Sequence, residues 1–168
     1  PDISDDGTRI AAVQVTPGGR SELHILSAKD GTLISATSSP DINLFTDPKF
    51  MDNETVVTAV RLNDGEMTLA MVAVSSGTIT RLTPASFNVV GYPCVYNGMI
   101  YFTASYEGND DVFVLRPAGK KIYRITHGPL GNYYVNAGHG KITWSAFTAE
   151  GYQLKQVNEK DITWEEVT

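Results

Sequence analysis

Four segments of this sequence repeat the same pattern of residues, at intervals of 42 to 47 positions. They start near Pro1, Pro48, Pro93 and Val135. Each opens with a short extended stretch and a tight turn, as at Asp6-Gly7 and Asn97-Gly98. Glycine suits such turns because it accepts a positive φ without a Cβ clash. The chain is therefore expected to be built from one supersecondary unit used four times.

Each segment contains three further stretches that predict β-strands, since β-branched and aromatic residues are bounded by turn residues. The second strands are expected over 9–15, 55–60, 99–104 and 141–147. The third strands are expected over 22–26, 68–74, 111–115 and 152–157. The fourth strands are expected over 33–36, 79–82, 122–125 and 162–167. No run of twelve or more residues has sustained helical spacing, so no long helix is predicted.

Repeats of this length with four strands each predict an all-β fold, a β-propeller of four four-stranded antiparallel blades. We expect one domain over 1–168, with blades over 1–47, 48–92, 93–134 and 135–168. The segments begin at a first strand and end at a fourth, which favours a partial ring, or fragment of a larger propeller. The outer faces of the terminal blades would then be apolar and could support self-association.

Composition excludes several classes of function. The formal net charge is −6, and basic residues do not cluster beyond Lys120-Lys121, so nucleic acid is not an expected partner. No apolar stretch approaches the length of a membrane helix, so no membrane insertion is expected. Cys94 is the single cysteine, which excludes an intramolecular disulfide and a thiolate cluster. His24, His127 and His139 lack the spacing of metal ligands, so neither a metal nor a cofactor is predicted.

Motifs of catalysis are not found. The sequence contains neither a Gly-x-Ser-x-Gly elbow nor a phosphate-binding Gly-x-x-x-x-Gly-Lys loop. Asp5 and Asp52 recur at one position of the repeat, which indicates turn caps rather than reactive groups. The acidic stretch 107–111 admits two interpretations, a calcium site or a polar hairpin between strands, and the hairpin is favoured. We therefore do not predict an enzyme.

Aromatic and polar residues on the loops that link blades, or that join second and third strands, are the candidate binding residues. Propeller ligands usually meet loops on one face, and exposed aromatic residues with polar neighbours are typical of interaction surfaces. The alternative is that these side chains pack between blades. The candidates are Phe45, Arg61, Phe87, Tyr92, Tyr106, His127, Asn132, Tyr133 and Tyr134.

The motif of a proline, an apolar residue, and a Ser-Asp-Asp-Gly or similar turn, with endings such as Arg81-Leu82-Thr83 and Arg124-Ile125-Thr126, resembles TolB-like repeats. Such WD-repeat-like blades are similar to those of TolB and of prolyl-oligopeptidase-like proteins. The resemblance implies a non-catalytic, protein- or peptide-binding scaffold in a larger periplasmic or extracellular protein. It leaves two alternatives open: a propeller that gates substrate entry to a hydrolase, and a carbohydrate-binding propeller.

Overall fold

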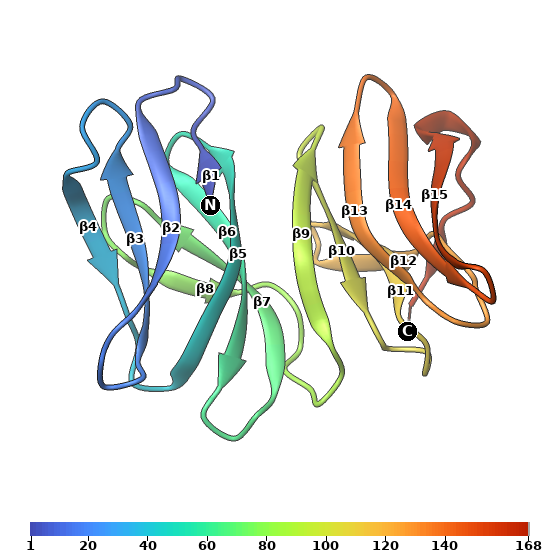
Figure 1. The fold of residues 1–168 in the computed structure, drawn as a ribbon, viewed down its shortest axis with the longest axis horizontal. Helices are drawn as coiled ribbons and strands as arrows, with labels where there is room; N and C mark the ends of the chain where they lie inside the picture. Colours follow the sequence, from blue (N-terminus) through green and yellow to red (C-terminus); the bar gives the residue numbers. More distant parts are fainter. Residues whose placement is uncertain (168) are drawn as a thin grey trace. The chain divides into compact units, whose positions relative to one another are not determined.

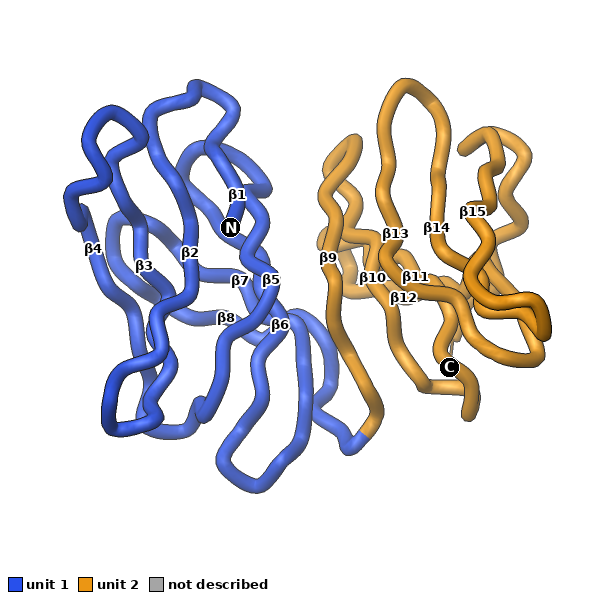
Figure 2. Tube along the Cα trace, in the orientation of Figure 1, with its two compact units in different colours: residues 1–87 blue, residues 88–168 orange. Residues whose placement is uncertain are grey.

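In residues 1–167, which the computed structural model describes, sixteen β-strands and one short 3₁₀ helix, Glu159–Asp161, account for the regular structure (Figure 1). The chain divides into two compact units, residues 1–87 and residues 88–168 (Figure 2). The predicted all-β architecture of antiparallel sheets is confirmed.

The first unit contains two four-stranded antiparallel sheets in which neighbouring strands are consecutive in sequence. One sheet is β1 (Asp2–Ile3), β2 (Arg9–Val15), β3 (Ser21–Ser27) and β4 (Leu33–Thr37). The other is β5 (Ile42–Asp52), β6 (Thr55–Leu62), β7 (Met67–Ala73) and β8 (Ile79–Arg81). The predicted second, third and fourth strands of these segments are confirmed to within two residues at each end.

A shared hydrophobic core holds these two sheets together. Leu23 and Ile25 alternate with half-buried residues along β3, as expected for a strand that covers a core with one face. They belong to one cluster with Phe45, Val56 and Val60 of the second sheet. Each such side chain contributes about 2 kcal/mol when it is withdrawn from water.

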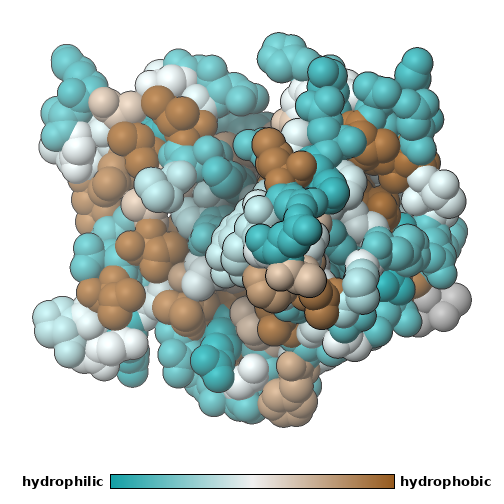
Figure 3. Space-filling view, turned by 45° about the vertical axis from the view of Figure 1, so that its right-hand side comes forward, coloured by the Kyte–Doolittle hydropathy of each residue, from teal (hydrophilic) through white to brown (hydrophobic). Residues whose placement is uncertain are grey.

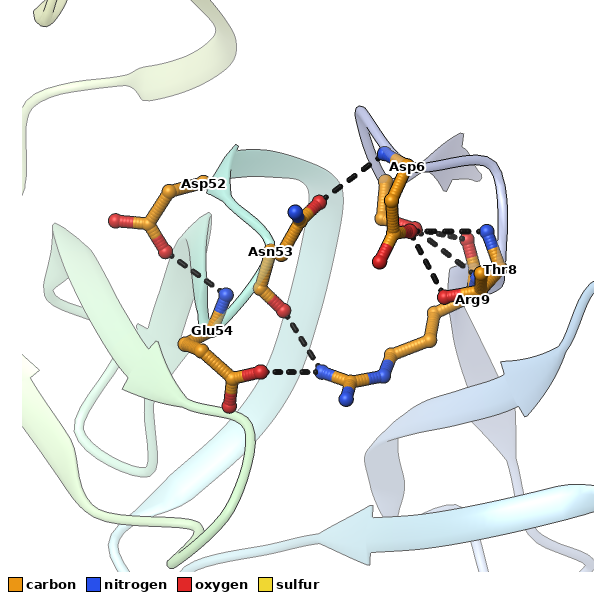
Figure 4. Close-up of polar contacts among 7 residues, drawn as sticks. Asp6, Thr8, Arg9, Asp52, Asn53 and Glu54 are labelled. Carbon is orange, nitrogen blue, oxygen red and sulfur yellow. Dashed lines mark hydrogen bonds and ion pairs between the residues drawn. The ribbon is translucent and has the colours of Figure 1, made fainter.

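Polar contacts also join the β1–β2 turn to the β5–β6 turn (Figure 4). The Arg9 guanidinium donates to the Asn53 carbonyl at 2.8 Å and to the Glu54 carboxylate at 2.9 Å. The backbone N–H of Asp6 donates to the Asn53 side-chain oxygen at 3.2 Å. Equivalent turns of two repeats are thus tied to each other.

The turn-cap prediction is right for Asp52 and wrong for Asp5. Asp52 accepts a hydrogen bond from the Glu54 N–H at 2.9 Å. In the first repeat it is Asp6 that accepts hydrogen bonds, from the Ser4 hydroxyl and from the N–H and hydroxyl of Thr8. These donors, the Ser4 hydroxyl foremost, lower the pKa of Asp6 to about 2.

Asp6→Ala is expected to lower the thermal midpoint of unfolding at neutral pH. Because the folded-state pKa lies below the ordinary 3.8, the carboxylate stabilises the fold above that pH, and this contribution is lost as the pH falls towards 2. Circular dichroism melts should show the gap between wild type and variant closing over that interval. Asp5→Ala removes a neighbouring exposed carboxylate and is the matched control. A gap that does not change with pH would contradict the assignment.

The second unit contains a five-stranded and a three-stranded antiparallel sheet. The larger sheet has the order β16-β12-β11-β10-β9, and the smaller one is β13-β14-β15. The strands of the larger sheet are β9 (Val90–Tyr96), β10 (Met99–Ala104), β11 (Asp111–Arg116), β12 (Lys121–Arg124) and β16 (Glu165–Glu166). Those of the smaller sheet are β13 (Asn132–Gly138), β14 (Lys141–Thr148) and β15 (Gly151–Asn158).

The prediction of a fourth strand over 162–167 in the last repeat is wrong. Only Glu165–Glu166 is a strand there, and it pairs with β12 of the preceding repeat instead of β15. Lys121 binds Glu166 at 3.0 Å, and the Trp164 ring lies edge-on against Tyr123 at 5.4 Å. These two contacts hold the segment against the neighbouring sheet.

Candidate functional site: a tyrosine surface on the second unit

The site begins with a bulge that recurs in the first strand of successive repeats. Asp47, Tyr92 and Tyr134 occupy equivalent positions and have φ values of 50°, 53° and 54°. In β9 and β13 the register shifts there, so that two residues of the first strand face one residue of the second. A left-handed backbone at a non-glycine residue costs about 1–3 kcal/mol and persists only where the surroundings impose it. The bulge turns Tyr92 and Tyr134 towards solvent.

Five aromatic side chains of the second unit form a continuous set, four of them exposed and Tyr133 half-buried, which we name the tyrosine surface: Tyr92, Tyr133, Tyr134, Phe147 and Tyr152. The Tyr92 and Tyr134 rings meet edge to face with centroids 4.6 Å apart, and they are 38% and 55% exposed. Tyr133 lies 6.3 Å from Tyr134 and 6.1 Å from Tyr152, and Tyr152 lies 4.9 Å from Phe147. Tyrosine at a surface offers a large apolar ring and a hydroxyl, the combination enriched in binding interfaces.

Tyr133 is the best-fixed member of the tyrosine surface. Burial, together with a hydrogen bond from its hydroxyl to the Asp110 carboxylate, raises the pKa of Tyr133 to about 12. Gly131 leaves the room for this ring: its φ is 115°, and a Cβ there would lie 2.5 Å from the Tyr133 hydroxyl. The ring position therefore depends on glycine at 131.

Gly131→Ala is expected to displace the Tyr133 ring and break its bond to Asp110. Without that bond and that burial, the pKa of Tyr133 should fall from about 12 towards its ordinary value of 10. A pH titration of tyrosine Cζ resonances by NMR, with Tyr133→Phe for assignment, measures this. Gly138→Ala is the control, because a Cβ there meets nothing within 4 Å. An unchanged Tyr133 titration in Gly131→Ala would contradict the account.

Beneath the tyrosine surface lies a buried polar network. The fully buried Asp111 carboxylate accepts hydrogen bonds from Arg124, from the Thr126 hydroxyl at 2.9 Å and from the Asn132 amide at 2.7 Å. The Asn132 side-chain oxygen in turn accepts from the Trp144 indole N–H at 2.8 Å. The network links β11 and β12 of one sheet to β13 and β14 of the next. It fixes Asn132, the residue directly before Tyr133.

Asp111→Ala is expected to destabilise the second unit by about 3 kcal/mol. The substitution leaves a part-buried guanidinium and two buried polar side chains without the carboxylate to which they donate hydrogen bonds. Both tryptophans, Trp144 and Trp164, belong to this unit, so urea unfolding followed by tryptophan fluorescence reports on it alone. Glu107→Ala in the adjacent hairpin removes an exposed carboxylate and should have little effect. If Asp111→Ala fails to fold, Asn132→Ala tests the same network more mildly. Equal midpoints for Asp111→Ala and Glu107→Ala would contradict it.

The structure distributes the sequence-predicted residues over different environments. It brings together Tyr92, Tyr133 and Tyr134, with Asn132 buried below them at 4% exposure. Phe45 is fully buried in the core of the first unit, so packing, the alternative considered for it, describes its place in this structure.

The remaining predicted residues are not part of the tyrosine surface. Tyr106 packs against Phe113 with ring centroids 5.1 Å apart. His127 lies 3.3 Å from the Glu165 carboxylate. In the first unit, Arg61 and Phe87 are exposed.

Sequence reasoning missed Phe147 and Tyr152. They face each other across the hairpin between β14 and β15, in a directly paired position. Pairing the two strands outward from the Ala149-Glu150 turn would have placed the two rings side by side. Lys155 and Trp144, which line a pocket beside the loop between β12 and β13, were missed as well.

The structure also shows the surroundings of the other polar residues considered in the sequence. The stretch 107–111 contains the hairpin between β10 and β11, and both oxygens of Asp111 accept hydrogen bonds from protein groups. His24 is part-buried, with its Nε2 2.9 Å from a Glu22 carboxylate oxygen. Within residues 1–167 no group of three or more His, Cys, Asp or Glu side chains is placed to hold a metal ion. No helix in that range is long and apolar enough to span a membrane.

Comparison with known proteins identifies the class of fold. Neither a protein-family model nor a curated protein matches the sequence. Solved structures do match, and the chain is structurally similar to β-propellers of the TolB kind.

Two of these structures are TolB proteins. A putative TolB from Agrobacterium tumefaciens superposes with a TM-score of 0.77 at 19% identity, over 98% of this chain and 62% of that one. TolB from Acinetobacter baumannii gives 0.75 at 15%, over 100% and 42%. A puromycin-hydrolyzing peptidase of Mycobacterium tuberculosis gives 0.75 at 14%, over 100% and 28%. The chain thus spans less than two thirds of these proteins, and the likeness shows the fold.

Proposed function

We propose that this chain is a non-catalytic interaction module of a larger extracytoplasmic protein, and that the tyrosine surface binds a protein or peptide partner. The observation that carries the proposal is the contiguous set of exposed rings centred on Tyr92 and Tyr134. Burying such rings in a partner interface yields more free energy than burying most other surface residues. The extracytoplasmic setting is inferred from the likeness to TolB.

The geometry of the rings supports a binding role over a purely structural one. Tyr134 is more than half exposed and has a strained backbone, so its present position gives the fold little burial energy. Tyr133 below it is held by Asp110 and Gly131, and Asn132 is held by the Asp111 network. A rigid base under exposed rings reduces the conformational entropy that a complex must lose on formation.

A second candidate is a propeller that gates substrate entry to a hydrolase. The likeness to the puromycin-hydrolyzing peptidase of Mycobacterium tuberculosis favours it. A Gly-x-Ser-x-Gly segment in the flanking coding sequence would support this candidate, and its absence there would favour the interaction module. A carbohydrate-binding role would instead appear as binding on a glycan array that Tyr134→Ala abolishes.

The proposal is tested by placing a photo-crosslinking phenylalanine analogue at position 134 in source cells. We expect a discrete cross-linked protein, identifiable by mass spectrometry, that is lost when Tyr92 is also changed to Ala. The same analogue at Asn97, an exposed turn residue at the other end of β9, is the control and should not give this product. Tyr134→Ala itself should change stability by less than about 0.5 kcal/mol, as expected for an exposed residue. Identical cross-links from positions 134 and 97 would contradict a partner at the tyrosine surface.

A further inference from the structure

The open edge of β15 is the feature of the second unit that the tyrosine surface does not explain. In the other three sheets the third strand has a fourth strand at its outer edge: β4 beside β3, β8 beside β7 and β12 beside β11. Within residues 1–167, β15 pairs with β14 alone, and it ends its sheet (Figure 1). An eight-residue strand with a free edge presents a row of N–H and C=O groups to which another strand can pair.

The segment that follows β15 pairs with a different sheet. Glu165–Glu166 pairs with β12, and the Val167 N–H donates to the Ile122 carbonyl at 2.9 Å. The ion pair of Lys121 with Glu166 and the 3.3 Å contact of His127 with the Glu165 carboxylate add to this attachment. Within residues 1–167, the segment that follows β15 therefore pairs with β12 and not with the outer edge of β15.

Next to this edge lies a pocket of about 470 Å3. It is formed by the loop between β12 and β13 and by the face of β14 and β15 that carries Trp144, Ala146 and Lys155. Trp144 and Lys155 are direct cross-strand partners, so Lys155 stands on the strand with the open edge, on the pocket side. Lys155 is the β15 residue that lines the pocket, so a strand added to β15 would place a side chain on the pocket side opposite Lys155.

The charge of the pocket indicates which strand would fit. His127 and Lys155 are its titratable lining residues, and no acidic residue lines it, although the protein carries a net charge of −6. His127 already pairs with Glu165, whereas the Lys155 ammonium donates to the neutral Gln153 side chain at 3.1 Å. Lys155 is thus the cation of the pocket lining that is left for a carboxylate supplied from outside. Figure 3 shows one face of the molecule, on which hydrophobic residues, in brown, are exposed among hydrophilic ones, in teal.

We propose that the open edge of β15 and the adjoining pocket bind an extended peptide segment of a partner protein by β-strand addition. The segment adds antiparallel to β15, as β4 does to β3, inserts an apolar side chain into the pocket and sets a carboxylate opposite Lys155. Main-chain hydrogen bonds supply affinity in this mode, and alternate side chains supply specificity. Phe147 of the tyrosine surface also lines this pocket, whereas Tyr92 and Tyr134 do not.

The test uses fluorescein-labelled hexapeptides of alternating isoleucine and threonine, with glutamate or lysine replacing one isoleucine. Fluorescence anisotropy should show saturable binding of the glutamate peptide, about threefold tighter than the lysine peptide, as expected for one exposed ion pair. Lys155→Glu should reverse this preference. Lys160→Glu makes the same charge change at an exposed residue outside the pocket and should leave it unchanged.

Two further measurements identify the mode of binding. Hydrogen exchange should show new protection confined to amides of β15, and methylating alternate peptide nitrogens on the bonding side should abolish binding. No binding of either peptide up to about 1 mM, or binding insensitive to Lys155→Glu, would overturn the proposal. A dimer detected by sedimentation and dissociated by Lys155→Glu would also overturn it, because the occupant would then be a second copy of this chain. Tyr92 and Tyr134 do not line this pocket, so failure of one proposal is distinguishable from failure of the other.

Discussion

Face-to-face stacking of two-sided sheets is the constraint on which the rest of this structure depends. A four-stranded sheet with apolar residues on one face cannot exclude water alone, so each sheet needs a neighbour. In the first unit Leu23 and Ile25 meet this need against Phe45 and Val56. In the second unit Tyr101, Val112 and Val114 belong to one cluster with Val135 and Ile142 of the three-stranded sheet. Turn contacts such as Arg9 to Glu54 then align sheets that apolar burial has already brought together.

Stacked sheets leave buried polar groups at equivalent positions, and the two units satisfy them with different chemistry. In the first unit the Thr83 hydroxyl accepts from the Leu69 N–H at 3.0 Å and bonds to the Thr68 hydroxyl at 2.9 Å. In the second unit the Thr126 hydroxyl accepts from the Val112 N–H at 2.8 Å, and Asp111 takes the place of Thr68. The carboxylate reaches farther and binds Asn132 of the next sheet. The second unit thereby gains a rigid support below Tyr133.

The repeat pattern predicted the strands well because strand positions depend on local residue type and on turns. It placed β2 and β10 at their observed limits, since Asp6-Gly7 and Asn97-Gly98 define both turns locally. Residues 162–167 were misassigned because pairing with β12 depends on Lys121 and Tyr123, which are about 40 residues away in sequence. Only part of the candidate site could be predicted from the sequence. Tyr92 and Tyr134 stand at a repeated position. Burial of Phe45 and packing of Tyr106 against Phe113 depend instead on the faces that neighbouring strands present, which no local pattern reveals.

Equivalent positions in the first and last sheets differ in burial and polarity. By strand register, Leu154 of β15 corresponds to Leu23 of β3, yet Leu154 is 78% exposed and Leu23 only 1%. Around them, Thr143 and Ser145 stand where β2 has Ala11 and Val13, and Gln156 stands where β3 has Ile25. In a permanently dry core these hydroxyl and amide groups would cost about 1–3 kcal/mol each unless paired. On this face Gln156 is exposed and the Thr143 hydroxyl donates to the Asn136 carbonyl at 3.4 Å, so this side of the last sheet differs in polarity from the side of the first sheet that carries Leu23.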